Sequence, residues 1–474
     1  MIFPPNTPHP TSSRPSAGHS SFQRFSFQHF SFSRIPPFPA LRSGPIADSG
    51  ASRQKQIPSR QAMNSYPRLG FYFAALIFCL MTKMAVALEE NGFVYIVNAG
   101  SATITQYKGP GGAANIPELL GGNPVLTIGN HSFKNASTVT SVTIPEGVTV
   151  IEDYAFYGCT GLTSISIPSS VKTIGKNTFS QCFSLTSVTF PPNATVIGYG
   201  AFSGCSSLAS VTLPKSISTI AGDLFFGCVN LLTVTIPSGV TNIEDGAFSK
   251  CFRLKSVTIP DSVRNIAGGT FRFCSDLTDV AIPESVTIIK GYTFFGCTSL
   301  SSVTIPSSVT SIGEYAFADC GSLTSVTIPS SVSSIGEHAY DGCRSLTSLT
   351  IPSSLSTISE GTFIGCSGLV SVAIPDSIIS IGERAFSSCS GLINVVIPSS
   401  VTSIGYGAFA ACSSLASVAI PDSVTDIGDE AFMQSGLTNV VIPPSVTRIN
   451  NQVFGGCFSL KNVTLPSSVT RSPT

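Results

Sequence analysis

The sequence predicts a repeat solenoid of about fifteen stacked turns of 23 residues each, and three periodic features support this prediction. A Pro recurs every 23 residues over positions 145–421, an aromatic residue does so over positions 133–432, and twelve Cys do so over positions 159–412. A strict period of this length is typical of proteins in which each repeat contacts only its neighbours. The interval shortens to 22 residues near "FMQSGL", where one repeat has lost a loop residue and its Cys.

Each element of the repeat follows from its own pattern, L-x-x-V-x-I-P-x-S-V-x-x-I-x-x-x-A-F-x-G-C-x-x. In "LTSVTIP", Val and Ile alternate with Ser and Thr, which predicts a strand with one buried face. The Pro ends this strand because it cannot donate into a ladder. The segment "SSVTSI" predicts a second short extended piece. The segment "GEYAFADC" predicts a helical or 3₁₀ turn that directs Ala, Phe and Cys inward on the opposite side.

The chain divides into four predicted segments. Residues 1–62 are rich in Ser, Phe, Pro and Arg and have no hydrophobic period, which predicts a disordered extension, with a transit peptide or a start codon placed too far upstream as alternatives. Residues 63–87 have the layout of a signal peptide, and an uncleaved anchor over residues 70–88 is the alternative. Residues 88–124 are predicted to cap the array, because an open first turn would expose apolar side chains and a strand edge. Residues 125–474 are the repeat array.

The repeat resembles the BspA-like class of leucine-rich repeats of bacterial and protist surface proteins. The resemblance covers about residues 125–470, and "ATITQY" near the start of the capping segment is similar to the opening unit of that class. It implies a leucine-rich-repeat horseshoe with β-strands on the concave face and short turns or 3₁₀ segments on the convex face. It also implies extracellular binding or adhesion by a secreted or cell-surface protein, and it implies no reaction.

Charge and composition restrict the classes of partner and chemistry. From Leu88 onward, sixteen basic residues stand against twenty-four acidic ones, a net charge of −8, whereas a nucleic-acid partner requires a basic face. We therefore expect no nucleic-acid partner, and a membrane contact only if residues 70–88 remain as an anchor. His131 and His338 are expected to face solvent, and Glu residues such as Glu314 to form a solvated rim. No catalytic residue, metal site or cofactor is predicted.

The thirteen Cys of the array are predicted to form a column of buried, reduced thiols. A metal ribbon and a chain of disulfides are the alternatives. Equivalent side chains of neighbouring turns lie about 5 Å apart in one line, so they neither converge as four zinc ligands do nor point toward one another. A buried thiol has a raised pKa and little access to oxidants, so such a column would react weakly.

The outward strand positions predict a binding surface for an extracellular protein or glycan. These positions form two columns of hydroxyls on the predicted concave face, represented at mid-array by Ser302, Thr304, Ser325, Thr327, Ser348 and Thr350. Three other interpretations remain: strand propensity alone, a wall or matrix component without a specific ligand, and an ice-binding array. The curvature of a horseshoe would spoil the flat lattice match that ice binding needs. From Ala373 onward the second column turns apolar. Glycosylation candidates in a secreted protein are the N-x-S/T sites at Asn130, Asn135, Asn193 and Asn462.

Overall fold

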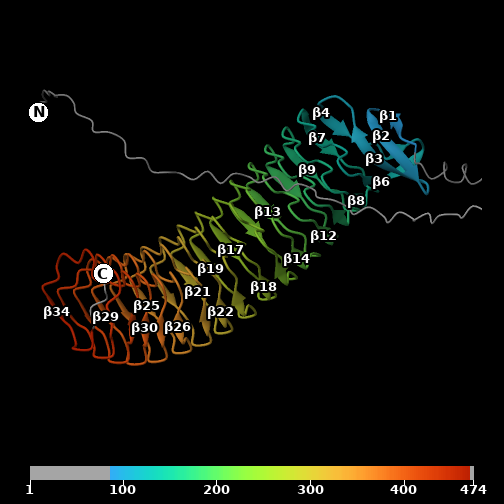
Figure 1. Ribbon diagram of the computed structural model, residues 1–474. Helices are drawn as coiled ribbons and strands as arrows, with labels where there is room; N and C mark the ends of the chain where they lie inside the picture. The colour runs from blue at the N-terminus through green and yellow to red at the C-terminus, as the bar shows by residue number, and fades with distance from the viewer. Residues whose placement is uncertain (1–85, 470–474) are drawn as a thin grey trace, which may run out of the picture. The chain divides into compact units, whose positions relative to one another are not determined.

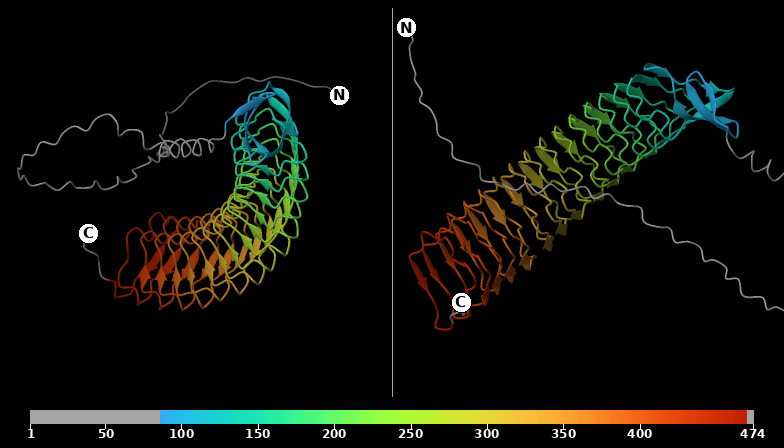
Figure 2. Two further views of the ribbon diagram at one scale, coloured as in Figure 1. Left: turned by 90° about the vertical axis from the view of Figure 1, so that its right-hand side faces the viewer. Right: turned by 45° about the horizontal axis from the view of Figure 1, so that its top comes forward.

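The computed structural model describes residues 86–469, and in this range the chain is a β-solenoid in which no residue is helical (Figure 1). The predicted fold class, a solenoid of leucine-rich-repeat turns, is confirmed. The described turns follow a continuous curve (Figure 2). The disordered extension predicted for residues 1–62 and almost all of the signal segment predicted for residues 63–87 lie outside the described residues.

The "SVT" segments stack in parallel in what we call the first ladder, which consists of three hydrogen-bonded sheets with breaks between residues 189 and 210 and between residues 304 and 325. Within a sheet, residues pair with their equivalents in the next turn, as Val326 does with Leu349, so every repeat position becomes a column along the solenoid. The ladder contains β4 (Gly112–Asn115), β7 (Val139–Thr143), β9 (Ser164–Ser166), β11 (Ser187–Thr189), β13 (Ser210–Thr212), β15 (Thr233–Thr235), β17 (Ser256–Thr258), β19 (Asp279–Ala281), β21 (Ser302–Thr304), β23 (Ser325–Thr327), β25 (Ser348–Thr350), β27 (Ser371–Ala373), β29 (Asn394–Val396), β31 (Ser417–Ala419), β33 (Asn439–Val441) and β34 (Asn462–Thr464).

The "SI" segments, predicted as a second short extended piece, form a second parallel ladder, which breaks between residues 197 and 219, 266 and 288, and 335 and 357. Its strands are two residues long, and the Ile of each is buried. They are β8 (Val150–Ile151), β10 (Thr173–Ile174), β12 (Val196–Ile197), β14 (Thr219–Ile220), β16 (Asn242–Ile243), β18 (Asn265–Ile266), β20 (Ile288–Ile289), β22 (Ser311–Ile312), β24 (Ser334–Ile335), β26 (Thr357–Ile358), β28 (Ser380–Ile381), β30 (Ser403–Ile404) and β32 (Asp426–Ile427).

The "GEYAFADC" segment forms turns, and the helical form allowed by the sequence does not occur. The Phe317 N–H donates to the Ala339 carbonyl of the next turn at 2.8 Å, whereas the following Ala318 N–H donates back to Tyr315 at 3.3 Å. Hydrogen bonds within one repeat therefore alternate with hydrogen bonds to the next repeat. This path requires left-handed backbone at two positions in each repeat, for example Tyr315 (φ 50°) and Asp319 (φ 57°). Residues other than Gly adopt a left-handed backbone only at a cost in free energy, which the hydrogen bonds between repeats offset.

The first described strands are antiparallel and lie at one end of the array (Figure 1). They are β1 (Leu88–Glu90), β2 (Phe93–Asn98) and β3 (Ser101–Tyr107). Strand β3 pairs in parallel with β6 (Asn123–Ile128). Strand β6 pairs in turn with β8 in parallel and with β5 (Leu119–Leu120) in antiparallel orientation. The Phe93 ring lies against Phe133, the first ring of the aromatic column, at 6.2 Å. Residues 88–124 therefore contact the first turns of the array; their role as a cap and the boundary at residue 125 stay predictions.

The core is a column of stacked aromatic rings beside a column of thiols. Consecutive rings, from Phe133–Phe156 at 4.8 Å to Phe432–Phe454 at 5.9 Å, stack nearly parallel. All thirteen array Cys are buried free thiols, and each S–H donates to the carbonyl of an aromatic residue in the preceding turn, as Cys343 does to Phe317 at 3.2 Å. Burial raises the pKa of the Cys297 thiol to about 12. The structure therefore places the thirteen thiols in the predicted buried column, and their reduced state in the secreted protein stays a prediction.

Candidate functional site

The six predicted binding residues lie on three consecutive strands of the first ladder, β21, β23 and β25, of which β23 and β25 are hydrogen-bonded to each other. They are exposed, and the residues between them, such as Val326 and Leu349, point into the core because side chains alternate along a strand. We call this surface the hydroxyl face; its residues are Ser302, Thr304, Ser325, Thr327, Ser348 and Thr350. It presents two hydroxyls per turn, repeated about every 4.8 Å along the ladder.

Hydrogen bonding separates the hydroxyl face from the hydroxyls beside it. In the adjacent outward column, Thr347 Oγ1 donates to the Thr324 carbonyl at 3.2 Å and Thr324 Oγ1 donates to the Ser301 carbonyl at 3.4 Å. Those hydroxyls link neighbouring turns. None of the six hydroxyls of the hydroxyl face has a hydrogen-bond partner among residues 86–469. The fold therefore leaves these six groups free to donate to and accept from a bound molecule.

The hydroxyl face continues into an aliphatic surface over β27–β33, as the change of residue type from Ala373 onward indicated. Val396 and Val441 stand in the same column as Thr327 and are each 63% exposed. In the adjacent outward column, Val370 and Ile393 are also exposed. A contiguous exposed aliphatic patch is a feature of surfaces that contact other molecules. We call these four residues the aliphatic extension.

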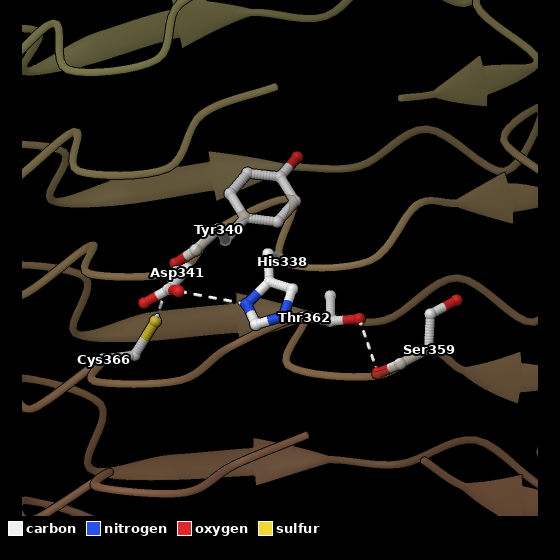
Figure 3. A network of polar contacts seen from close by, with 6 residues as sticks. All are labelled: His338, Tyr340, Asp341, Ser359, Thr362 and Cys366. Atoms are coloured by element: carbon white, nitrogen blue, oxygen red, sulfur yellow. Dashed lines mark hydrogen bonds and ion pairs between the residues drawn. The ribbon is translucent and has the colours of Figure 1, made fainter. Parts of the chain in front are cut away.

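A polar network around His338 brings together side chains of the types that take part in catalysis (Figure 3). His338 Nδ1 lies 3.0 Å from Asp341 Oδ2, and its ring stacks on Tyr315 at 4.7 Å. His131 is exposed, as expected, but the expectation that His338 also faces solvent is wrong, because this stack and the Asp341 contact leave it only partly exposed. Burial raises the pKa of the Asp341 carboxyl, although the hydrogen bond to His338 acts in the opposite direction.

This network does not contain an activated nucleophile. The Cys366 thiol is fully buried and donates to the Tyr340 carbonyl at 3.3 Å, with no contact to the imidazole (Figure 3). Burial raises its pKa to about 12, so it stays a neutral thiol near pH 7. Nucleophilic catalysis by Cys needs a thiolate in reach of a base, and this arrangement provides neither. In the part of the chain that the structure describes, no group of three or more His, Cys, Asp or Glu side chains is placed to hold a metal ion.

The four glycosylation candidates, Asn130, Asn135, Asn193 and Asn462, are all exposed. Asn462 lies on the last strand and donates from Nδ2 to Asn439 Oδ1 at 2.8 Å. Their modification stays a prediction. No helix within residues 86–469 has the length and apolar character needed to cross a membrane.

The stacked ladders, the aromatic column and the exposed strand face define a leucine-rich-repeat solenoid. The chain belongs to the BspA-type leucine-rich-repeat family, whose model matches it in overlapping segments at residues 126–255, 201–322, 241–370, 310–438 and 362–473. This confirms the resemblance inferred from the repeat pattern.

Several solved structures similar to this chain are of bacterial leucine-rich-repeat proteins. One from Bacteroides ovatus is 29% identical, with a TM-score of 0.56, over 81% of this chain and 89% of its own. A leucine-rich cell surface protein from Faecalibacterium prausnitzii is 30% identical, with a TM-score of 0.39, over 81% of this chain and 95% of its own. One from Eubacterium ventriosum is 25% identical, with a TM-score of 0.49, over 74% of this chain and 94% of its own. No curated protein gives a significant match to the chain.

Proposed function

We propose that this protein is a non-catalytic recognition or adhesion solenoid, secreted or displayed at the cell surface, that binds an extracellular protein or glycan through its hydroxyl face. One observation carries the proposal: six exposed hydroxyls in a regular two-column array take no part in the hydrogen bonding of the fold, although the neighbouring column does. Leucine-rich-repeat solenoids bind partners across such extended surfaces. The signal-like segment at residues 63–87 supports the location.

Binding at this face would be additive along the ladder. Each turn contributes a Ser and a Thr, so a partner gains contacts in proportion to the number of turns that it covers. The aliphatic extension would add apolar burial at the end of the same surface, at about 25 cal/mol for each Å² removed from water. Weak polar contacts repeated over several turns, together with one apolar anchor, give adhesion without a deep pocket.

The test is a comparison of two double variants on arrays of extracellular proteins and glycans. Thr327→Arg with Thr350→Arg places two long charged side chains on the hydroxyl face. The matched control, Ser334→Arg with Thr357→Arg, places the same groups on exposed positions of the second ladder in the same two turns. We expect the first variant to weaken binding by at least about tenfold, or about 1.4 kcal/mol, and the control to bind like the natural protein.

The rival interpretation, a structural wall or matrix component, predicts a different outcome. If the natural protein binds no protein or glycan on these arrays, that interpretation is favoured and the recognition function is rejected. Equal loss of binding in both double variants would also reject the assignment of the hydroxyl face.

A further inference from the structure

A groove outside the first ladder has the features of a second binding site. It occupies about 340 Å³, a volume within the range of small-molecule sites, and runs beside the Cys column over five consecutive turns. Its lining includes Phe252, Phe273, Thr298, Asp319, Gly321 and Arg344. No lining residue belongs to the hydroxyl face. We propose that this groove binds a neutral linear oligosaccharide.

Glycines line the groove, and at two of them a neighbouring lining side chain packs directly on the backbone. Gly296 and Gly342 occupy the left-handed position before Cys, with φ of 72° and 69°. A Cβ at Gly296 would lie 2.6 Å from Cδ1 of Phe273, and a Cβ at Gly342 would lie 2.7 Å from Oδ1 of Asp319. The Phe273 ring and the Asp319 carboxylate therefore lie over these glycines.

Aromatic rings form one end of the groove and are held in place by their neighbours. Phe252 is 41% exposed. The Phe273 ring packs edge-on against Phe295 at 5.2 Å, and the Arg272 guanidinium lies 5.0 Å from the Phe273 ring centre. The negative face of a fixed, partly exposed ring attracts the partly positive C–H groups on one side of a sugar ring. This end of the groove therefore provides the exposed Phe252 ring as a stacking surface, beside a Phe273 ring that Arg272 covers on one side.

Polar groups line the rest of the groove, and the fold does not use their charges. Neither the Asp319 carboxylate nor the Arg344 guanidinium makes an ion pair or a side-chain hydrogen bond with a residue in the range 86–469. A carboxylate accepts from sugar hydroxyls and a guanidinium donates to sugar oxygens. One unpaired negative and one unpaired positive group favour a neutral ligand. Thr298 Oγ1 donates to the Ser275 carbonyl at 3.3 Å and keeps its oxygen as an acceptor.

The length and walls of the groove favour a linear sugar chain over a peptide. Five turns at a strand spacing of about 4.8 Å extend roughly 19 Å, which is longer than a single sugar. An extended peptide binds best by adding to an exposed strand edge. Every residue that lines the groove lies in a connecting loop and not in a strand, so the groove offers no strand edge.

Two variants with a matched control test the proposal. Gly321 has an ordinary φ and no atom within 4 Å of its added Cβ, so Gly321→Leu fills the groove without straining the backbone. Phe252→Ala removes a stacking surface. The control Phe183→Ala removes a comparably exposed ring, 46% exposed, from the same column three turns away and outside the groove. The probes are cellohexaose, mannohexaose, chitohexaose and an acidic hyaluronan hexasaccharide, titrated calorimetrically into the purified protein.

We expect at least one neutral hexasaccharide to bind, with affinity lowered at least about tenfold in Gly321→Leu and Phe252→Ala and unchanged in Phe183→Ala. The proposal is overturned if no neutral probe binds, if Gly321→Leu leaves the affinity unchanged, or if the acidic probe binds most tightly. The hydroxyl-face variant Thr327→Arg with Thr350→Arg should keep this affinity. Loss there, with Gly321→Leu unaffected, would place the sugar on the hydroxyl face instead.

Discussion

Replacing Phe317 by Ala should strongly destabilise a short stretch of the array and leave the rest intact. The Phe317 ring is fully buried and stacks between Phe294 at 5.3 Å and Tyr340 at 5.2 Å, with interplanar angles of 11° and 9°. Truncation removes both stacks and leaves a cavity between two turns. Since each turn contacts only its neighbours, the cavity cannot be closed by a shift elsewhere in the solenoid.

The expected loss of local stability is about 3–5 kcal/mol, the usual cost of truncating a buried Phe. The upper half of this range is expected, because each lost stacked pair contributes about 0.5–1.5 kcal/mol beyond its buried area. Thr327→Ala is the control in the next turn. Its side chain is exposed and makes no hydrogen bond within the described chain, so the expected cost is within about 0.5 kcal/mol.

Native-state hydrogen exchange followed by mass spectrometry measures the effect turn by turn. Peptides covering the turns of Phe294, Phe317 and Tyr340 should lose protection in Phe317→Ala, and peptides around Phe156 should not. The assignment of inward and outward positions would be refuted if Thr327→Ala were equally damaging. A uniform loss of protection along the whole array would refute nearest-neighbour stabilisation.

Three further predictions concern buried polar groups. Tyr340 replaces Phe in the aromatic column and its buried hydroxyl has no hydrogen-bond partner among residues 86–469, so Tyr340→Phe should stabilise the protein by about 1–3 kcal/mol in urea unfolding; destabilisation would show that the hydroxyl is satisfied. Burial raises the pKa of the Cys159 and Cys412 thiols from 9.0 to about 12, so the unfolded chain releases protons first and stability should be full below pH 9 and fall between about pH 9 and pH 12. A urea midpoint that stays constant across that window would contradict this, and Cys412→Ala should make the decline shallower. The thirteen array thiols should be almost inert to a thiol reagent in the native protein and react fully after denaturation without prior reduction; several disulfides in the native protein would contradict the thiol column.

The period and the alternation of side chains were sufficient to predict the ladders from the sequence. Val326 and Thr327 are adjacent, and alternation alone assigns one to the core and the other to the surface. The turn segment could not be predicted in the same way. Its local pattern is compatible with a helical turn, but the Phe317 N–H bonds the next turn instead, and that partner exists only after stacking. The recurring Gly before Cys signals one left-handed position, whereas Tyr315 and His338 at the other give no such signal.

The two candidate sites also differ in how much of each the sequence predicts. Exposure of the hydroxyl face follows from alternation, but the sequence does not reveal that the Thr324 hydroxyl bonds a carbonyl while the Thr327 hydroxyl does not. The sequence does not predict the groove, because its lining comes from five successive turns, with open space at Gly321 and lining side chains packed on Gly296 and Gly342. Such a groove becomes visible only when the repeats are stacked.

The central claim is that the hydroxyl face is the principal contact surface, and carbene footprinting of the protein with and without a partner captured on the arrays tests it most directly. The account predicts that the partner protects the peptides carrying β21, β23 and β25 and leaves the second-ladder strands β22, β24 and β26 in the same turns fully labelled. Protection confined to the second ladder or the turns, with the first ladder labelled as in the free protein, would contradict it.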